Sequence, residues 1–477
     1  MSSSTPAATV QQRSTVRWVV TIAALALLFD GYDLVVYGTV VSTLLADPSH
    51  LGPLDAAQAG ALGSYALVGV LVGALTTGAV GDYLGRRRVM ITGIVWFSLG
   101  MALTALASSA LVFGVFRFLT GIGVGALVAT AGAVVAEFAP AGKRNFYNAI
   151  VYSGIPAGGV LASLLALVLL EPLGWRGLFL IGALPLLVLL PMALLRLPES
   201  PQWLAARGRL AEAQALAART GVVLVLPAAA PAAPAGTVRK ESADDAAARR
   251  VGFAALATRR YALPTLLLGL MSFSGLLLTY GLNTWLPVIM GQFGYGPEFS
   301  LTFLLVLNAG AIAGGLIASV SADRLGPGRV VSSTFFLAAV AMVALTLQLP
   351  FAVLLVLVAV AGVGTIGTQV LIYGLVSNYY SANARGAGVA WCAGFGRLGG
   401  IFGPLIGGFL IAAGVENETA FYVFAGVAVV GALVTMFVPR RRGSDAGSGP
   451  GAGTGTGAGS VAGGAAPVQE TESPAPA

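Results

Sequence analysis

The sequence contains Gly81-Asp82-Tyr83-Leu84-Gly85-Arg86-Arg87-Arg88 between two long apolar segments, and a related stretch, Ala322-Asp323-Arg324-Leu325-Gly326-Pro327-Gly328-Arg329, at the matching place in the second half of the chain. A second pair of related stretches joins residues 143–159 to residues 385–400, because in each a basic residue precedes a glycine-rich run. Two copies of one helix pattern predict a chain built of two related halves in parallel repeat.

The composition indicates that this repeat lies in a membrane. The chain has 477 residues, of which 57% are hydrophobic and only 9% are charged. Soluble domains carry roughly 25% charged residues, so this chain has too few to cover a surface that faces water. A spanning helix needs about 20 apolar residues. Twelve such segments are predicted, at 18–45, 59–80, 88–108, 111–138, 147–170, 176–196, 262–290, 299–320, 329–349, 351–379, 387–413 and 419–439.

The predicted fold class is therefore an all-α membrane protein with twelve transmembrane helices in two six-helix bundles. Most of the 26 Lys and Arg residues fall in the termini, the central linker and alternate loops, which places both termini in the cytoplasm. That dispersal also argues against nucleic acid as the reason for the net charge of +7. The expected divisions are a cytoplasmic N-terminus (1–17), a first bundle (18–196), a cytoplasmic linker (197–260), a second bundle (261–439) and a disordered cytoplasmic tail (440–477).

Several chemistries are disfavoured. Cys392 is the one cysteine and His50 the one histidine, so neither a disulfide nor a zinc centre of the usual kind is expected, and no cofactor or metal is predicted. The run Gly121-Ile122-Gly123-Val124-Gly125 follows no strand and lies inside an apolar segment, so close helix packing explains it better than dinucleotide binding. No set of a nucleophile and a base is evident, and the chain is not expected to be an enzyme.

Ionisable residues at membrane depth are costly, by at least about 2.5 kcal/mol each, and so indicate function. Asp30 and Asp33 share one face of the first segment. At a rise of about 1.5 Å per residue, Asp33 lies about 22 Å from one boundary and Arg117 about 9 Å from the other, which gives them nearly equal depth. These residues, with Glu137 near the end of the fourth segment, are the candidate proton-coupling groups. The alternative is a static ion pair that holds helices together.

Arg397 is the one cation deep in the second half, and no acidic residue lies at its depth there. A guanidinium offers a planar fork that fits a carboxylate, so we predict that Arg397 binds an anionic substrate. Alternatively it bonds main-chain carbonyls or pairs with Asp30. Weaker candidates for binding an aromatic ring and its hydroxyl, each as easily a packing or lipid-facing residue, are Tyr152, Tyr280, Asn283, Trp285, Gln369 and Tyr373.

The repeated loop stretch resembles the signature of the major facilitator superfamily, although Pro327 and Gly328 replace part of its basic run in the second copy. Pro198-Glu199-Ser200-Pro201-Gln202-Trp203-Leu204 is similar to a motif that the superfamily's sugar porters share. The resemblance implies gating roles for the loops between helices. The candidate gating residues are Gly81, Asp82, Gly85, Arg86, Arg144, Asp323, Arg324 and Arg385.

Within the superfamily, Asp30-Gly31-Tyr32-Asp33 resembles the aspartate pair of the aromatic acid:proton symporters. The stretch 117–123 with Glu137, and Gly396-Arg397-Leu398-Gly399, are similar to helices four and eleven of that family. The resemblance implies proton-driven import of benzoate-type or hydroxybenzoate-type carboxylates across the bacterial inner membrane. The expected partners are the aromatic acid, protons and the lipid bilayer, without nucleic acid, for a chain expected to act as a monomer.

Other functions stay open at this point. A proton symporter for a sugar or another organic acid would have the same fold, but two buried arginines beside the aspartates disfavour a neutral sugar. The glycine-rich segment with Pro156 loosely resembles an exporter motif, so export of aromatic metabolites or drugs is an alternative. A sensor is disfavoured because no signalling domain is evident.

Overall fold

The computed structural model describes residues 10–140, 143–222, 224, 253–258, 261–347, 349–380 and 382–439, and these contain helices and no strands. The first half comprises α1 (Val10–Ala46), α2 (Ala56–Leu84), α3 (Arg86–Ala105), α4 (Ala110–Phe138), α5 (Arg144–Tyr152), α6 (Gly154–Ile181), η1 (Leu184–Leu186) and α7 (Leu189–Arg196). The linker contributes α8 (Pro201–Ala206), α9 (Leu210–Thr220) and α11 (Phe253–Leu256). The tail predicted to be disordered, 440–477, lies outside the described residues.

The second half comprises α12 (Ala262–Gln292), α13 (Pro297–Leu325), α14 (Pro327–Ala344), α15 (Phe351–Gly362), the π-helical turn η2 (Val363–Gly367), α16 (Thr368–Tyr379), α17 (Ala382–Ala412) and α18 (Asn417–Phe437). Among the described residues, 11 helices are long and apolar enough to cross a membrane. The predicted fold class, an all-α membrane protein of two bundles, is confirmed.

The sixth predicted span, 176–196, is the one that differs from expectation. The structure continues α6 through Trp175 to Ile181 and then adds η1 and α7, so that no single long helix fills this span. The cause is local: Pro172 lacks a main-chain donor, Gly174 takes a non-helical φ of 64°, and Pro185 lies in the first turn of η1. The break at Gly174 thus falls at the predicted boundary between the fifth and sixth segments, whereas η1 interrupts the sixth segment itself.

The two loop motifs have the same main-chain geometry. Gly85 joins α2 to α3 with a φ of 91°, and Gly326 joins α13 to α14 with a φ of 90°. Residues with a side chain rarely adopt a positive φ, so both turns need glycine. The match shows that the repeat seen in the sequence is also a repeat in structure.

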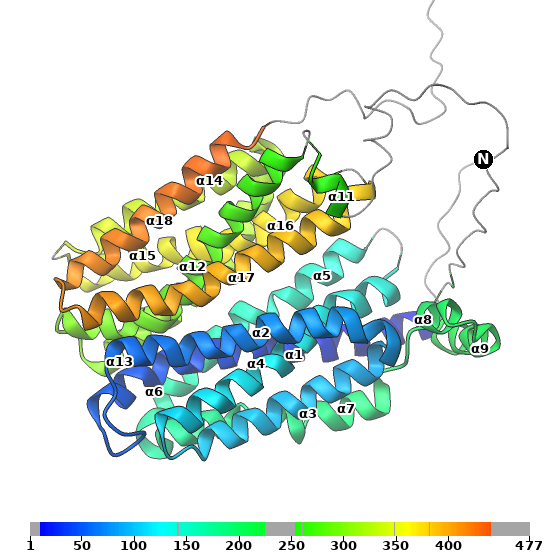
Figure 1. Ribbon diagram of the computed structural model, residues 1–477, viewed down its shortest axis with the longest axis horizontal. Coiled ribbons are helices and arrows are strands. Elements are labelled where there is room, and N and C mark those ends of the chain that lie inside the picture. Colours follow the sequence, from blue (N-terminus) through cyan, green and yellow to red (C-terminus); the bar gives the residue numbers. More distant parts are fainter. Residues whose placement is uncertain are drawn as a thin grey trace, which may run out of the picture. The chain divides into compact units, whose positions relative to one another are not determined.

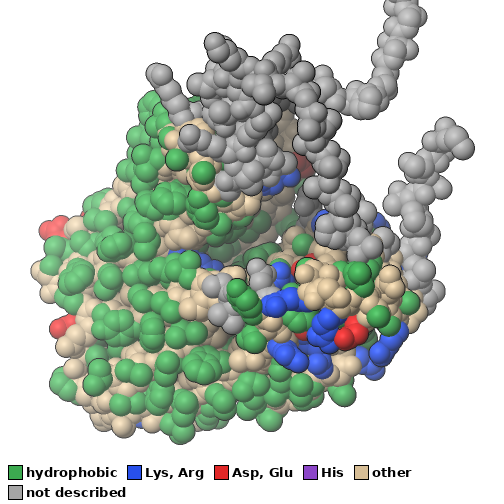
Figure 2. All heavy atoms as spheres, turned by 45° about the vertical axis from the view of Figure 1, so that its right-hand side comes forward, with side chains coloured by type: hydrophobic (Ala, Val, Ile, Leu, Met, Phe, Trp, Pro, Cys, Tyr) green, Lys and Arg blue, Asp and Glu red, His purple; other side chains and the backbone are tan. Residues whose placement is uncertain are grey.

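The two bundles meet along three helix pairs, α2 with α17, α6 with α13 and α1 with α12 (Figure 1). We call the end that carries the first residues of α1 and helices α8, α9 and α11 the linker end. The closest approaches between the bundles lie toward the opposite end, where Ser64 of α2 donates to the carbonyl of Ile401 in α17 at 2.7 Å. Figure 2 shows the surface hollowed between the bundles at the linker end. The interface is thus closed at one end and open at the other.

Glycines set the spacing between α1 and α6. A Cβ on Gly31 would overlap the carbonyl oxygen of Ile155, and a Cβ on Gly158 would overlap that of Leu28. Small residues of this kind allow two helices in a membrane to come close. The two helices therefore cross with their main chains in contact.

Gly31→Ala is expected to destabilise the protein by about 1–3 kcal/mol, because α1 and α6 must separate to admit the methyl group. The midpoint of thermal unfolding in detergent measures this effect. Gly291→Ala is the matched control, since Gly291 lies in α12 with no atom within 4 Å of the added Cβ. Equal midpoints for the two variants would contradict the packing argument.

Candidate functional site

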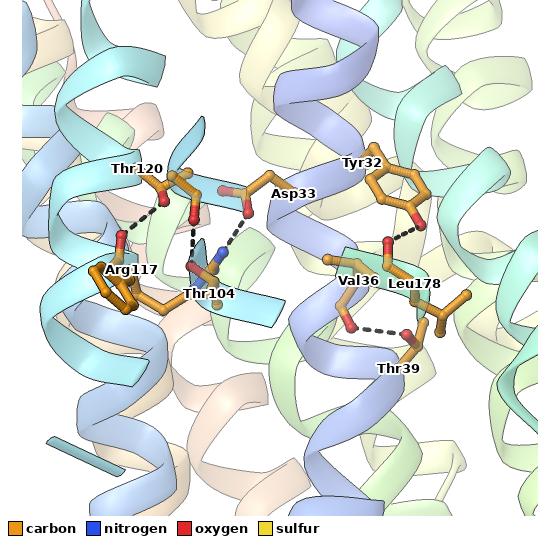
Figure 3. A network of polar contacts seen from close by, with 10 residues as sticks. Tyr32, Asp33, Val36, Thr39, Thr104, Arg117, Thr120 and Leu178 are labelled. Carbon is orange, nitrogen blue, oxygen red and sulfur yellow. Dashed lines mark hydrogen bonds and ion pairs between the residues drawn. The ribbon is translucent and has the colours of Figure 1, made fainter. Parts of the chain in front are cut away.

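The tetrapeptide of residues 30–33 sends successive side chains of α1 in different directions. The hydroxyl of Tyr32 donates to the main-chain carbonyl of Leu178 at 2.8 Å, while Gly31 packs on the main chain of Ile155. Figure 3 shows Tyr32 and Asp33 on opposite sides of α1. The two middle residues of the motif thus fix α1 to the first bundle and leave the two aspartates for other partners.

Asp33 forms an ion pair with Arg117 of α4. Both are buried: Asp33 is 4% exposed and Arg117 is 2% exposed. The guanidinium carbon of Arg117 also lies 5.5 Å from the ring centre of Tyr37 and 5.7 Å from that of Phe179, within range of cation–π attraction. The pair joins α1 to α4, which agrees with the similar depths counted for the two residues from the sequence.

Asp30 has a different environment. It is 9% exposed and lines a small cavity together with Asp33, Arg117 and Tyr280. The cavity has a volume of about 20 Å³, which is room for about one water molecule. Among the described residues Asp30 has no ion-pair partner. The Asp30 carboxylate therefore lacks the bonded cation that the Asp33 carboxylate has.

Arg397 reaches this region from the other bundle. Its Nη1 donates to the main-chain carbonyl of Val70 in α2 at 3.0 Å, across the interface between the halves. Its charge lies within electrostatic range of Asp30, Tyr152 and Tyr280. The bond to a carbonyl is one of the two alternatives left open by the sequence. This hydrogen bond uses one N–H group of the Arg397 guanidinium. Among the described residues no carboxylate forms an ion pair with Arg397.

Two of the weaker candidates, Gln369 and Tyr373 of α16, belong to the same region. Tyr373 lies within electrostatic range of Arg397. Gln369 is 6% exposed, and its Nε2 donates to Ser272 Oγ at 3.1 Å, whereas its Oε1 is buried without a hydrogen-bond partner among the described residues. Gln369 lies two residues after the π-helical turn η2, and such turns are frequent at functional sites. An unpaired buried acceptor is costly unless something donates to it.

Trp285 and Asn283 lie elsewhere. Trp285 is fully buried, and its Nε1 donates to the carbonyl of Pro404 at 2.8 Å, so its side chain packs α12 against α17. Asn283 accepts a hydrogen bond from Nδ2 of Asn308 in α13 at 2.9 Å. Neither lines the cavity beside Asp30. Asn308 was not among the sequence candidates, although an amide inside an otherwise apolar segment was a signal for it.

The structure separates Glu137 from the two aspartates. Glu137 lies at the linker end, where its Oε1 is 3.3 Å from Nε of Arg86. The prediction that groups Glu137 with Asp30 and Asp33 is therefore corrected. Glu137 lies in the last turn of α4, far along the helix from Arg117. Its partner comes from the loop motif itself.

The loop motif also binds the stretch that follows α7. The backbone N–H of Arg87 donates to Glu199 Oε1 at 3.0 Å, and Arg87 Nε donates to the carbonyl of Leu197 at 2.7 Å. Ser200 caps α8 by accepting the N–H of Trp203. Glu199, quoted within its motif but given no role from the sequence, thus connects the motif to the first loop. In this conformation these described contacts join the first half to the linker and not to the second half.

The remaining gating candidates lie at the linker end. Gly81 and Gly85 are buried at the α2–α3 junction, and the side chain of Asp82 lies outside the described part of the structure. Four other gating candidates have exposed side chains, and none of these forms an ion pair with a described residue: Arg144, Asp323, Arg324 and Arg385. Their gating roles stay predictions.

Comparison with known proteins agrees with this geometry. The profile of the Major Facilitator Superfamily matches residues 23–351 and 307–470. The chain is 34% identical to the gentisate transporter of Corynebacterium glutamicum, over 85% of this chain and 84% of the relative. It is 30% identical to the benzoate transport protein of Acinetobacter baylyi, over 89% and 90%. It is 32% identical to the gallate transporter of Pseudomonas putida, over 88% and 91%.

A solved structure of a D-xylose–proton symporter superposes with a TM-score of 0.69 over 89% of this chain and 98% of the other, at 20% identity, and so supports the fold. The resemblance read from the loop motif and from the aspartate tetrapeptide is confirmed by these relatives. They are transporters, so the expectation that the chain is not an enzyme is confirmed as well. The chain belongs to the Major Facilitator Superfamily and is a multi-pass membrane transporter.

Proposed function

We propose that the protein imports small aromatic carboxylates together with protons, by alternating access, across the bacterial inner membrane. The observation that carries the proposal is the group at the interface between the bundles: the free carboxylate of Asp30, the cation of Arg397 and the tyrosines around them. The names of the relatives, which include gentisate, benzoate and gallate transporters, favour an aromatic acid over other anions.

Charge balance suggests how the proton is coupled. Asp33 and Arg117 neutralise one another, so the remaining deep charges are Asp30 and Arg397. An uncompensated charge at this depth is costly. When a substrate carboxylate binds Arg397, Asp30 is left in excess unless it takes up a proton. One proton then enters with each substrate molecule, and the loaded interface carries no net charge.

The surrounding side chains suit a hydroxylated ring. Tyr152, Tyr280 and Tyr373 lie within electrostatic range of Arg397 and would offer aromatic surface to a ring. Oε1 of Gln369, which has no hydrogen-bond partner among the described residues, can accept a hydrogen bond from a ring hydroxyl. A site that offers a buried acceptor discriminates strongly against ligands that lack the donor. Hydroxybenzoates are therefore the preferred class in this proposal.

The distribution of Lys and Arg in the sequence favours a cytoplasmic position for the linker end and for both termini. The hollow between the bundles at that end would then be the route by which the substrate leaves toward the cytoplasm (Figure 2). The closed contacts at the opposite end would separate to admit it from outside.

Uptake into proteoliposomes tests the proposal. Labelled hydroxybenzoate is expected to accumulate inside when the interior is alkaline and to stop accumulating when a protonophore collapses the gradient. Benzoate is expected to accumulate with lower affinity, and xylose not at all. Uptake that ignores the proton gradient, or that prefers the sugar, would refute the assignment.

A further inference from the structure

A second cavity lies at the linker end, apart from Asp30 and Arg397. It has a volume of about 760 Å³ and lies between the start of α1, the start of α3, the end of α7 and helices α8 and α9. Figure 2 shows Lys and Arg side chains gathered on this end. The charged residues that line the groove are Arg87, Arg88, Arg196, Arg209, Arg219, Glu199 and Glu212.

The two glutamates of the groove are already engaged. Both carboxylate oxygens of Glu212 accept hydrogen bonds from Arg209, at 2.8 and 2.5 Å. Glu199 Oε1 accepts the backbone N–H of Arg87. Neither carboxylate forms an ion pair with the other three arginines among the described residues. The lining therefore carries an excess of positive charge.

The partners of the other arginines leave their charge in place. The guanidinium of Arg87 donates to two main-chain carbonyls at the end of α7, which are neutral acceptors. That of Arg196 stacks 5.0 Å from the ring centre of Trp18. Arg88 and Arg219 are exposed, and within the described chain their side chains have no hydrogen bond or ion pair. Two unpaired guanidinium groups thus face one groove.

One wall of the groove is apolar. Leu194 and Leu195 of α7 line it, and they are 49% and 81% exposed. They directly precede Arg196, so apolar and basic side chains are adjacent at the end of α7. A phospholipid has the same order of parts, with an acyl chain below a phosphate. A soluble anion would use the arginines and leave the leucines bare.

We propose that this groove binds an anionic phospholipid, with its phosphate at Arg88 and Arg219 and an acyl chain along Leu195. Basic pockets at the ends of membrane helices attract anionic headgroups. The carbonyl of Arg219 also accepts a hydrogen bond from Gln11 Nε2 of α1 at 2.5 Å, so a lipid held there strengthens the attachment of α9 to α1. The inference needs only that the chain spans a membrane and does not depend on the substrate.

Thermal unfolding in detergent tests this site. Phosphatidylglycerol is expected to raise the unfolding midpoint, and phosphatidylcholine to leave it unchanged. Removal of each arginine is expected to weaken the apparent affinity for phosphatidylglycerol about fivefold, so that Arg88→Gln with Arg219→Gln weakens it about 25-fold. The control is Arg329→Gln, which removes an exposed arginine of α14 outside the groove.

Phosphatidylglycerol that stabilises the double variant at the same concentrations as the parent would overturn the proposal. Soluble glycerol phosphate that raises the midpoint as well as the lipid does would also overturn it, and would assign the arginines to a soluble anion. Uptake of substrate by the double variant, measured alongside, shows that its fold is intact. If it does not fold, Arg219→Gln alone gives the same comparison at about fivefold.

Discussion

Asp30→Asn is expected to abolish accumulation of an aromatic acid against its gradient and to leave exchange of labelled for unlabelled substrate intact. The amide mimics the protonated carboxyl group, so the loaded interface stays neutral and can still change conformation. The empty variant, however, retains the uncompensated charge of Arg397. It also lacks the carboxyl group at residue 30 that would release a proton before the empty carrier returns. Gradient-driven uptake should therefore fall to the level of empty liposomes, whereas counterflow should stay within a few-fold of the parent.

Asp33→Asn serves as the contrasting variant, because it leaves Arg117 buried without its partner. Breaking a buried pair in this way costs about 3–5 kcal/mol, so loss of folded protein is expected along with loss of transport. If Asp30→Asn accumulates substrate like the parent, the coupling role of Asp30 is wrong. If both variants merely unfold, the two aspartates act alike and the distinction drawn from their partners fails.

Arg397→Lys is expected to raise the KM for hydroxybenzoate about tenfold or more, although the site stays cationic. The ammonium group lacks the bidentate fork, and a charge-assisted hydrogen bond is worth about 1.5–3 kcal/mol. Competition assays complete the measurement. Benzoate-type acids should compete for uptake by the parent, whereas the matching amides and alcohols should not.

Trp285→Phe provides the control within the second bundle. The Trp285 side chain donates to the Pro404 carbonyl rather than lining the cavity, so its replacement should change stability more than KM. Equal competition by the neutral amide would remove the physical basis for a carboxylate at Arg397. A large KM effect for Trp285→Phe would place the substrate closer to Trp285 than proposed here.

The sequence could predict depth along a helix, but not the direction in which a side chain points. Counting residues placed Asp33 and Arg117 at one depth, and the structure joins them. The same counting could not show that Trp285 turns toward α17 or that Glu137 meets Arg86, because both depend on how a helix is rotated against its neighbours.

The sequence also could not predict contacts between segments that are far apart along the chain. Glu199 meets the first loop motif only because α7 returns the chain to the linker end. The sequence did place a boundary between residues 170 and 176, where the chain breaks at Gly174. It missed the further break at η1, because apolar length alone does not show where a helix is interrupted. The fold class required only the length and number of the apolar segments and the repeat, which is why the sequence could predict it.

The turn of α1 at residues 30–33 also restricts how this protein can evolve. Tyr32 and Asp33 are bound to α6 and α4, and Gly31 has no space for any side chain. Point mutations at residues 31–33 are therefore expected to damage the first bundle before they alter selectivity. Under the proposed function, new specificities would arise by drift in α12, α16 and α17, while the first half is inherited nearly unchanged as the proton-handling part of the carrier.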